Sequence, residues 1–194
     1  MNLLVLGPQG SGKGTQAAVI AEAHGIPHVS TGDMFRAAIA VETELGLRVK
    51  EIIDSGELVP DELTTELVQE RLSAPDAAAG FVLDGYPRNL GQAEALAAWL
   101  ESVGRSLDAV LFFDLRDELA MERALGRAAA AGRSDDTPDV IARRLALYHQ
   151  ETEPLVAFYR ASGVLVTLHA ERSIAEVSAE IEAALELVRE GRAA

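Results

Sequence analysis

A glycine-rich segment at residues 7–15, GPQGSGKGT, has the residue types and spacing that bind phosphate groups. Gly7, Gly12 and Lys13 match the pattern G-x-x-x-x-G-K-[ST], in which backbone N–H groups and a lysine hold the phosphates of a nucleoside triphosphate. Gly14 departs from this pattern, because a Ser or Thr that binds Mg²⁺ usually follows the lysine. A plain glycine turn is the structural alternative, but the apolar run before the segment and the helical pattern after it favour phosphate binding.

Two oxygen-bearing side chains could replace the missing magnesium ligand. Thr15 lies in the first turn of the expected helix, so its hydroxyl could reach the ion through a water molecule. Asp84 ends the apolar run FVLD, and an acidic residue at such a strand end faces the magnesium in proteins with this loop. Gly85 and Pro87 follow it, so Asp84 could instead be a turn residue. We expect Mg²⁺ near Thr15 and Asp84.

Arginine supplies nearly all of the positive charge, since only Lys13 and Lys50 of the 17 basic residues are lysines. A compositional bias would explain this, and so would a local positive pocket for a small phosphorylated ligand. Arg88 follows a strand end, where ligands of open α/β sheets bind. A ring of arginines would neutralise the charge on a transferring phosphoryl group. The candidates are Arg36, Arg88, Arg123, Arg127, Arg133 and Arg144.

The sequence shows no obvious general base that could activate an alcohol. The histidines are scattered without metal-ligand spacing, and we expect all of them to be structural: His24, His28, His149 and His169. A phosphate-monoester acceptor needs no base, because its second pKa of about 6 leaves it mostly deprotonated at neutral pH. It has only to be aligned with the donor and kept from water. The polar segment 125–137, with Arg127 and Arg133, is expected to be mobile and to close over the phosphates.

Five apolar runs predict the strands that position these residues. They alternate with helical patterns and are apolar through their length, as in parallel strands covered on both faces. This alternation predicts a doubly wound α/β sheet. The runs are residues 2–7, 28–30, 81–85, 109–115 and 164–170.

Start signals place three of the helices. Asn89 and Gln92 have the spacing of a capping box before one helix. Thr137 and Pro138 begin a long helix to about residue 162, which Pro154 should bend or split. Ser173 and Glu176 cap the last helix. The residues expected on one face of that helix are Ile174, Val177, Ile181, Leu185 and Val188.

Composition narrows the classes of protein and partner. The 194 residues suffice for one compact domain, and no apolar run approaches the length of a membrane span. A net charge of −14 disfavours nucleic acids and anionic membranes as partners. The N-terminal residues lack the pattern of a signal peptide, so we expect a cytoplasmic protein. Without cysteine there is no thiolate zinc site.

Several motifs occur in the order seen in nucleoside monophosphate kinases, and together the chain resembles the short-lid adenylate kinases. These motifs are GPQGSGKGTQ, STGDMFR, SGELVP, LDGYPRN, GR…GRSDD and RRLALYHQETEPLVAFY. The resemblance implies a P-loop NTPase fold, three-layer α/β/α with a five-stranded parallel sheet, in a single domain over residues 1–194. It implies a helical monophosphate-binding insertion at 30–59 and a short lid at 126–136. The implied reaction is ATP plus AMP to two ADP with Mg²⁺, in a monomer.

The resemblance also assigns residues by motif match. Those implied to bind ATP are Gly10, Ser11, Gly12, Lys13, Gly14, Thr15, Arg123, Arg127 and Arg172. Those implied to bind AMP are Thr31, Arg36, Glu57, Leu58, Val59, Gly85, Tyr86, Pro87, Arg88, Gln92, Arg133 and Arg144. The implied catalytic set is Lys13, Arg88, Arg123, Arg133 and Arg144. The bond before Pro87 is implied to be cis.

Two alternatives stay open at this point. A UMP/CMP or broad-specificity monophosphate kinase has a similar sequence, but Thr31 and the adenine-pairing amide of Gln92 favour AMP. A switch protein that binds ATP without transferring phosphate would not need so many arginines. Gln9 and Phe35 replace residues more usual in the family. The cysteine-free lid excludes the zinc of some relatives.

Overall fold

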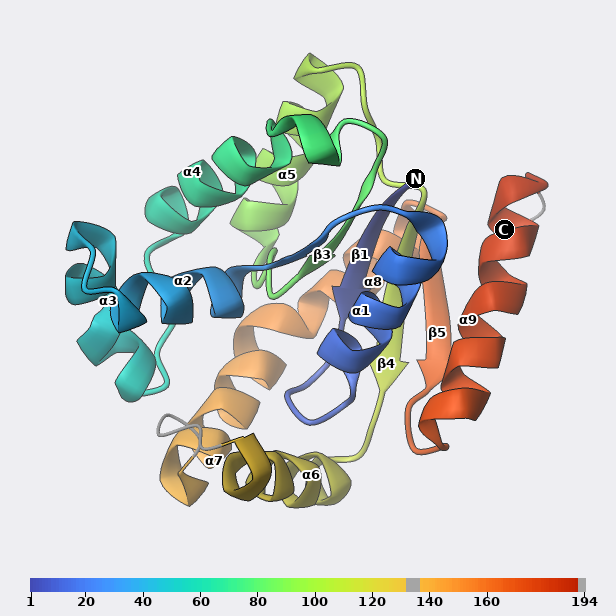
Figure 1. Ribbon diagram of the computed structural model, residues 1–194. Helices are drawn as coiled ribbons and strands as arrows, with labels where there is room; N and C mark the ends of the chain where they lie inside the picture. Colours follow the sequence, from blue (N-terminus) through green and yellow to red (C-terminus); the bar gives the residue numbers. More distant parts are fainter. Residues whose placement is uncertain (132–136, 192–194) are drawn as a thin grey trace.

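The computed structural model describes residues 1–131 and 137–191, with the backbone alone for 128–131. Strands and helices alternate along the chain around a single sheet (Figure 1). The five predicted strands are confirmed, each within one residue of its predicted limits. They are β1 (Asn2–Leu6), β2 (His28–Ser30), β3 (Phe81–Asp84), β4 (Ala109–Asp114) and β5 (Leu165–His169).

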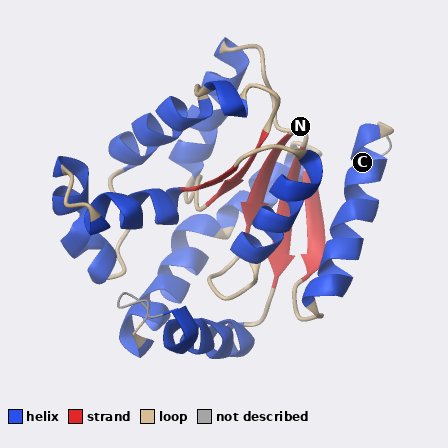
Figure 2. Ribbon diagram, viewed as in Figure 1, coloured by secondary structure: helices blue, strands red, loops and turns tan. Residues whose placement is uncertain are grey.

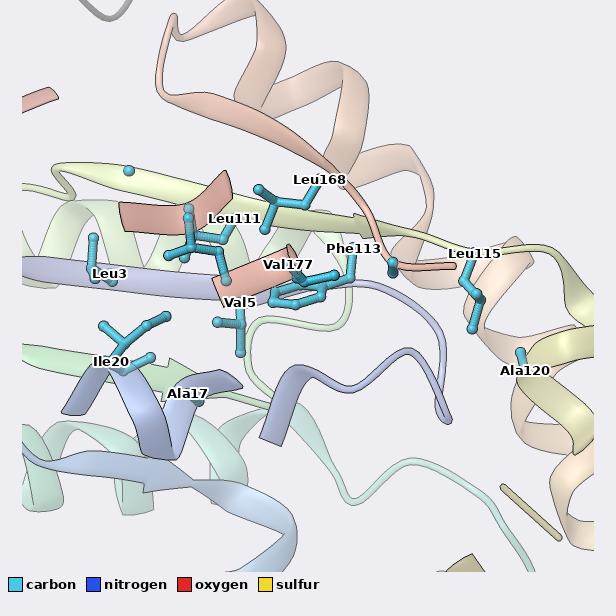
Figure 3. Packing of buried hydrophobic residues seen from close by; sticks show 14 of the residues in the cluster. Leu3, Val5, Ala17, Ile20, Leu111, Phe113, Leu115, Ala120, Leu168 and Val177 are labelled. Atoms are coloured by element: carbon cyan, nitrogen blue, oxygen red, sulfur yellow. The ribbon is translucent and has the colours of Figure 1, made fainter. Parts of the chain in front are cut away.

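All strands are parallel, in the order β2-β3-β1-β4-β5. The central strand is β1, which pairs with β3 on one side and β4 on the other. Both faces of β1 are buried, which explains its uninterrupted apolar run. Leu3 and Val5 pack into one hydrophobic cluster (Figure 3), and Leu4 and Leu6 pack into a second cluster on the opposite face.

Helices cover both faces of the sheet and produce three layers (Figure 2). The α-helices are α1 (Lys13–His24), α2 (Thr31–Ala40), α3 (Glu44–Asp54), α4 (Asp61–Leu72), α5 (Leu90–Ser102), α6 (Asp117–Ala131), α7 (Pro138–Leu147), α8 (Pro154–Ala161) and α9 (Ile174–Arg189). Side chains of α1 and α9 join the cluster of Leu3, whereas α4, α5 and α8 contribute to the cluster of Leu4. The expected three-layer α/β/α fold with five parallel strands is confirmed.

The long helix predicted from Pro138 is split, as Pro154 suggested. Between α7 and α8 a π-helical turn, Tyr148–Thr152, shifts the hydrogen-bond register. The N–H of Glu153 donates to the carbonyl of Tyr148 at 2.8 Å, five residues back. The cause is Pro154, which has no N–H and would clash with the carbonyl four residues before it.

The predicted helix starts are largely confirmed. Ser173 and Glu176 form both bonds of a capping box at α9. Asn89 accepts the N–H of Gln92 at α5, but the Gln92 side chain bonds elsewhere, so that box is only half formed. Ile174, the first residue of α9, is 62% exposed, because it lies beyond the packed part of the apolar face.

A third and smaller cluster is centred in residues 31–59, away from the sheet. Phe35, Val49 and Val59 form its centre, and side chains from α2, α3 and α4 surround them. Within the described residues, no helix is long and apolar enough to cross a membrane. Residues 132–136 of the expected lid lie outside the part that the structure describes.

Candidate functional site

A cavity of about 960 Å³ opens at the carboxyl ends of β1, β2 and β3. This edge is where ligands of open α/β sheets bind. Its wall includes the loop after β1, the segment 56–59, the turn after β3, and arginines of α6 and α7. Most of the residues assigned by motif therefore meet in one cavity, although they come from distant parts of the chain.

The loop between β1 and α1 has the backbone that its glycines allow. Gly10 and Gly12 have φ angles of 82° and 89°, in the left-handed region. A Cβ on Gly10 would lie 2.3 Å from the carbonyl oxygen of Ala120, so only glycine fits against α6. The Ser11 hydroxyl is buried at the cavity wall, and no described residue hydrogen-bonds to it. A ligand oxygen in the cavity could satisfy it.

Lys13 begins α1 and faces the cavity. Its Nζ donates to the Pro8 carbonyl at 2.7 Å, which bends the side chain back over the loop. Burial lowers the pKa of Lys13 to about 8, an effect that Asp84 opposes and that Arg88 and Arg127 reinforce. A phosphate beside this cluster of positive charge would stabilise all three cations.

Asp84 ends β3 directly opposite the loop. Its Oδ2 lies 3.4 Å from the position that a Cβ on Gly14 would take, and 3.6 Å from Nε2 of His28. Gly14 occupies the position that is Ser or Thr in the common pattern. This position therefore faces the Asp84 carboxylate in this chain too. Thr15 lines the same cavity.

These oxygens suit Mg²⁺, which binds through one or two carboxylates together with waters and substrate phosphates. Across residues 1–131 and 137–191, no three His, Cys, Asp or Glu side chains gather into a self-sufficient metal site. The donor set of Asp84 and Thr15 therefore fits a magnesium ion that arrives with a nucleotide.

Arg88 is fixed by bonds on its backbone and side chain. Its Nε donates to the Gly85 carbonyl at 2.8 Å, and its own carbonyl accepts the Thr152 hydroxyl at 2.7 Å. Because only Nε is used in the first bond, the Nη groups remain for a planar anion. Burial lowers the pKa of Arg88, and the nearby guanidinium of Arg144 lowers it further.

The turn after β3 brings the residues of the DGYPR motif against Thr31. Gly85 has a φ of 83°, and a Cβ there would lie 2.6 Å from Oγ1 of Thr31. The peptide bond between Tyr86 and Pro87 is cis, as the resemblance implied. Tyr86 is the one described member of the AMP set whose side chain does not line the cavity: it is 1% exposed, and its hydroxyl bonds to Thr65 and the Gln92 carbonyl.

Gln92 lines the cavity, and both ends of its side-chain amide are hydrogen-bonded. Oε1 accepts the backbone N–H of Arg88 at 2.7 Å, and Nε2 donates to Oδ1 of Asp61 at 2.7 Å. Asn89 donates to the same carboxylate at 2.9 Å. The start of α4 is thereby tied to the start of α5 beside the cavity.

The other described arginines of the predicted set also line the cavity. Arg36 pairs with Asp33, and Arg144 donates to the Ile53 carbonyl at 3.1 Å. Arg123 donates to the Ala170 carbonyl at 2.6 Å, which joins α6 to the end of β5. Arg127 lies on the next turn of α6. Both are on one helix, as predicted.

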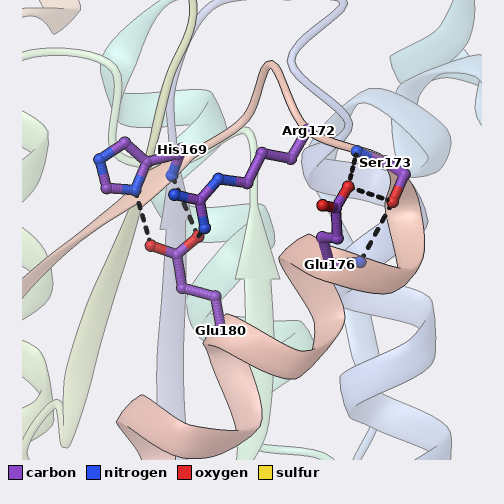
Figure 4. A network of polar contacts seen from close by, with 5 residues as sticks. All are labelled: His169, Arg172, Ser173, Glu176 and Glu180. Carbon is purple, nitrogen blue, oxygen red and sulfur yellow. Dashed lines mark hydrogen bonds and ion pairs between the residues drawn. The ribbon is translucent and has the colours of Figure 1, made fainter.

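The Arg172 side chain is directed toward Glu180 of α9 (Figure 4). Its Nη1 lies 3.7 Å from Oε2 of Glu180, whose Oε1 lies 2.8 Å from Nδ1 of His169. In the segment 57–59, the Glu57 carboxylate pairs with Arg143 at 2.9 Å. Arg133 lies outside the described residues.

Sequence reasoning missed three residues at the site. His28 was expected to be structural, yet it lines the cavity beside Asp84. Gln9 donates to the Ile141 carbonyl at 3.0 Å and so joins the phosphate loop to α7. Asp61 contacts Gln92, 31 residues away, and no local pattern signals such a contact.

Comparison with known proteins agrees with this geometry. The family model for adenylate kinase matches residues 5–164. Over 185 residues the chain is 47% identical to the adenylate kinase of Stenotrophomonas maltophilia (strain K279a), with 95% of this chain and 99% of that protein covered. With the same coverage it is 50% identical to that of Mycobacteroides abscessus and 48% identical to that of Rhodococcus erythropolis. The chain therefore belongs to the adenylate kinase family.

Proposed function

We propose that the chain catalyses the reaction of its family, reversible transfer of a phosphoryl group from ATP to AMP to give two ADP. One observation carries the proposal at the level of the site. The phosphate loop and the DGYPR turn, with their cations Lys13 and Arg88, line the same cavity. A cavity with two anion-binding halves suits transfer between two phosphorylated nucleotides better than binding of a single one.

The donor half is formed by the loop and α6. Backbone N–H groups of residues 10–15 and the charge of Lys13 hold the ATP phosphates. Arg123 and Arg127 line the same cavity as the loop, and Arg172 lies in the segment between β5 and α9. In this assignment, the arginines neutralise the charge that develops on the leaving ADP.

The acceptor half lies toward the insertion. Arg36, Arg88 and Arg144 hold the AMP phosphate, and Arg133 joins them in this proposal. The segment 57–59, Gly85 and Pro87 form the wall, while Thr31 and Gln92 read the base. Arg88 suits the central role because its backbone and Nε are fixed while its Nη groups remain for an anion.

The acceptor phosphate is already deprotonated at neutral pH, so the side chains perform no general-base step. They align the two nucleotides, neutralise charge and exclude water. Asp84 and Thr15 would hold Mg²⁺, whose positive charge neutralises the phosphate oxygens when it is bound. Removal of Mg²⁺ with a chelator should therefore abolish turnover.

We further propose the division of the chain implied by its family. Residues 30–59 act as the monophosphate-binding insertion, which the separate cluster of Phe35, Val49 and Val59 supports. Residues 126–136 act as the lid. The protein works as a cytoplasmic monomer in this proposal, for which the absence of cysteine and the net charge of −14 are the support.

An acceptor assay tests the proposed function. Initial rates with ATP are measured for AMP, UMP, CMP and GMP, and we expect AMP to be the preferred acceptor. Arg88→Ala should lower kcat with AMP by at least about 100-fold, because it removes fixed positive charge from the transferring group. Arg71→Ala is the matched control, since Arg71 pairs with Asp76 and does not line the cavity.

Three outcomes would contradict the assignment. Preference for UMP or CMP would make the protein a pyrimidine monophosphate kinase. Full activity of Arg88→Ala with AMP would mean that the acceptor phosphate is not bound at the DGYPR turn. ATP binding without transfer to any of the four acceptors would support the alternative that the chain is a switch protein.

A further inference from the structure

The amide of Gln92 is held at both ends by groups that cannot exchange roles. Nε2 donates to Oδ1 of Asp61, and Oε1 accepts the N–H of Arg88, both at 2.7 Å. Gln92 is 2% exposed, so few water molecules compete with these bonds. Asn89 donates to both carboxylate oxygens of Asp61, at 3.1 and 2.9 Å, and this holds the carboxylate in place.

These partners permit one orientation of the amide. The carboxylate of Asp61 only accepts hydrogen bonds, and the backbone N–H of Arg88 only donates them. A 180° rotation of the amide would set Oε1 against the Asp61 oxygen and Nε2 against the Arg88 N–H. Both contacts would then be repulsive, so nitrogen and oxygen are assigned by chemistry and not by shape.

The same orientation decides what the amide can offer a ligand. Nε2 has a second hydrogen and Oε1 has a second lone pair, and Gln92 lines the cavity. A donor and an acceptor side by side match a base that presents a ring acceptor beside an amino group. Adenine presents N1 and its 6-amino group in this way. A 6-oxopurine presents N1–H and O6, which is the reverse polarity.

We propose that Asp61 is a positioning residue for base selection. Through the Gln92 amide it favours 6-aminopurine monophosphates and disfavours their 6-oxo analogues. The inference rests on the proposed function, because it requires the acceptor base to reach Gln92. Asp61 itself is exposed at the start of α4 and does not line the cavity, so it acts only through Gln92.

The test compares AMP with inosine monophosphate, its 6-oxo analogue, in the parent protein, Asp61→Ala and Asp61→Asn. Both substrates carry the same charge, so a general electrostatic effect of losing the carboxylate cancels in the ratio of their kcat/KM values. We expect the preference for AMP to fall by about tenfold or more, because the reversed amide is no longer repelled at Asp61. The change should appear in KM of the monophosphate, while kcat with AMP and KM for ATP stay within about twofold.

Glu62→Gln is the matched control, because it removes the neighbouring exposed carboxylate outside this network. It should leave the ratio unchanged. A purely structural role of Asp61 would instead lower Tm and change kcat/KM for both substrates by the same factor.

A ratio within twofold of the parent in both Asp61 variants would overturn the inference. Asp61→Asn keeps the shape of the side chain and carries the comparison if Asp61→Ala does not fold. A parent protein active with AMP whose ratio persists in the variants overturns the role of Asp61 alone. A parent protein that does not phosphorylate AMP overturns the proposed function and this inference with it.

Discussion

The only two lysines of the chain have opposite surroundings. Lys13 is held over the phosphate loop, where burial lowers its pKa to about 8. Lys50 is on the surface of α3, where its hydrogen bond to Asp54 raises its pKa. The first lysine is therefore destabilised as a cation by folding, and the second is stabilised. Binding of an anion at the phosphate site stabilises the charged form of Lys13, which burial disfavours.

This contrast predicts opposite effects of two alanine substitutions. Lys13→Ala should reduce kcat by at least about 100-fold, because it removes charge next to the transferring group. Its Tm at pH 7 should equal or exceed that of the parent, since the folded chain no longer bears a partly buried cation with a lowered pKa. Lys50→Ala should keep full activity and lose a little stability. Steady-state kinetics and thermal unfolding measure both, and a large drop in Tm for Lys13→Ala would indicate a structural lysine.

At the scale of elements, His149 joins the π-helical turn to the start of α6. Nε2 lies 2.9 Å from the carboxylate of Asp117, and Nδ1 lies 2.9 Å from Glu153. Hydrogen bonds to Glu153 and then Asp117 raise the pKa of His149. The protonated ring can donate to both carboxylates at once, whereas the neutral ring can donate to only one.

A pH-dependent stability follows from this pair of bonds. Because the folded pKa is raised, the contribution is full below the unfolded pKa of about 6.5 and is lost as pH rises through the folded value. The parent should therefore melt about 1–3 °C above His149→Gln at pH 6, and at the same temperature as that variant at pH 9. Other titrations are common to both proteins and cancel. An equal difference in Tm between the parent and His149→Gln at the two pH values would contradict a stabilising role of the protonated His149 ring.

The sequence predicted the elements better than it predicted the contacts between them. Continuous apolar runs identified all five strands, because strands buried on both faces have no polar alternation to obscure them. Pro154 predicted the break after α7, since its effect is local. The half-formed capping box at Asn89 was not predictable, because the Gln92 side chain chooses between a local bond and partners brought by the tertiary fold.

The same distinction applies to the site. Glycines, Lys13 and the arginines could be found from spacing and motif, since they are required by the phosphates. His28 and Asp61 could not, because each acts on another residue, Asp84 or Gln92, across strands or helices. Their roles depend on the order of the strands and on the packing of α4 against α5, neither of which has a signature within a short window of sequence.

At the scale of the whole molecule, the apolar core is unevenly distributed. Two large clusters cover the faces of the sheet, whereas the insertion has a small one around Phe35, Val49 and Val59. Arg143 and Arg144 link the insertion to α7 through Glu57 and the Ile53 carbonyl. A segment with little buried apolar surface opens at a lower free energy than the core that it is attached to.

Native-state hydrogen exchange should therefore show two levels of protection. Amides of α3 should exchange through a local opening, at a free energy well below that of global unfolding, while amides of β1 and β3 exchange only with global unfolding. Addition of AMP should slow exchange in α3, because binding across the cavity couples the insertion to the sheet. Equal protection of α3 and β1 would show that the insertion unfolds only with the rest of the chain.

The central place of β1 has a consequence for how the protein is made. Among the strands of this sheet, the central strand β1 leaves the ribosome before the others, and its neighbours β3 and β4 are encoded some 80 to 110 residues later. Until those residues are synthesised, the segment NLLVL has no partner on either side. At about 5–20 residues per second, the nascent chain carries this apolar strand unpaired for several seconds. The residues that open the phosphate loop are thus translated before the neighbouring strands of the sheet and acquire their final geometry only after β3 and β4 have emerged.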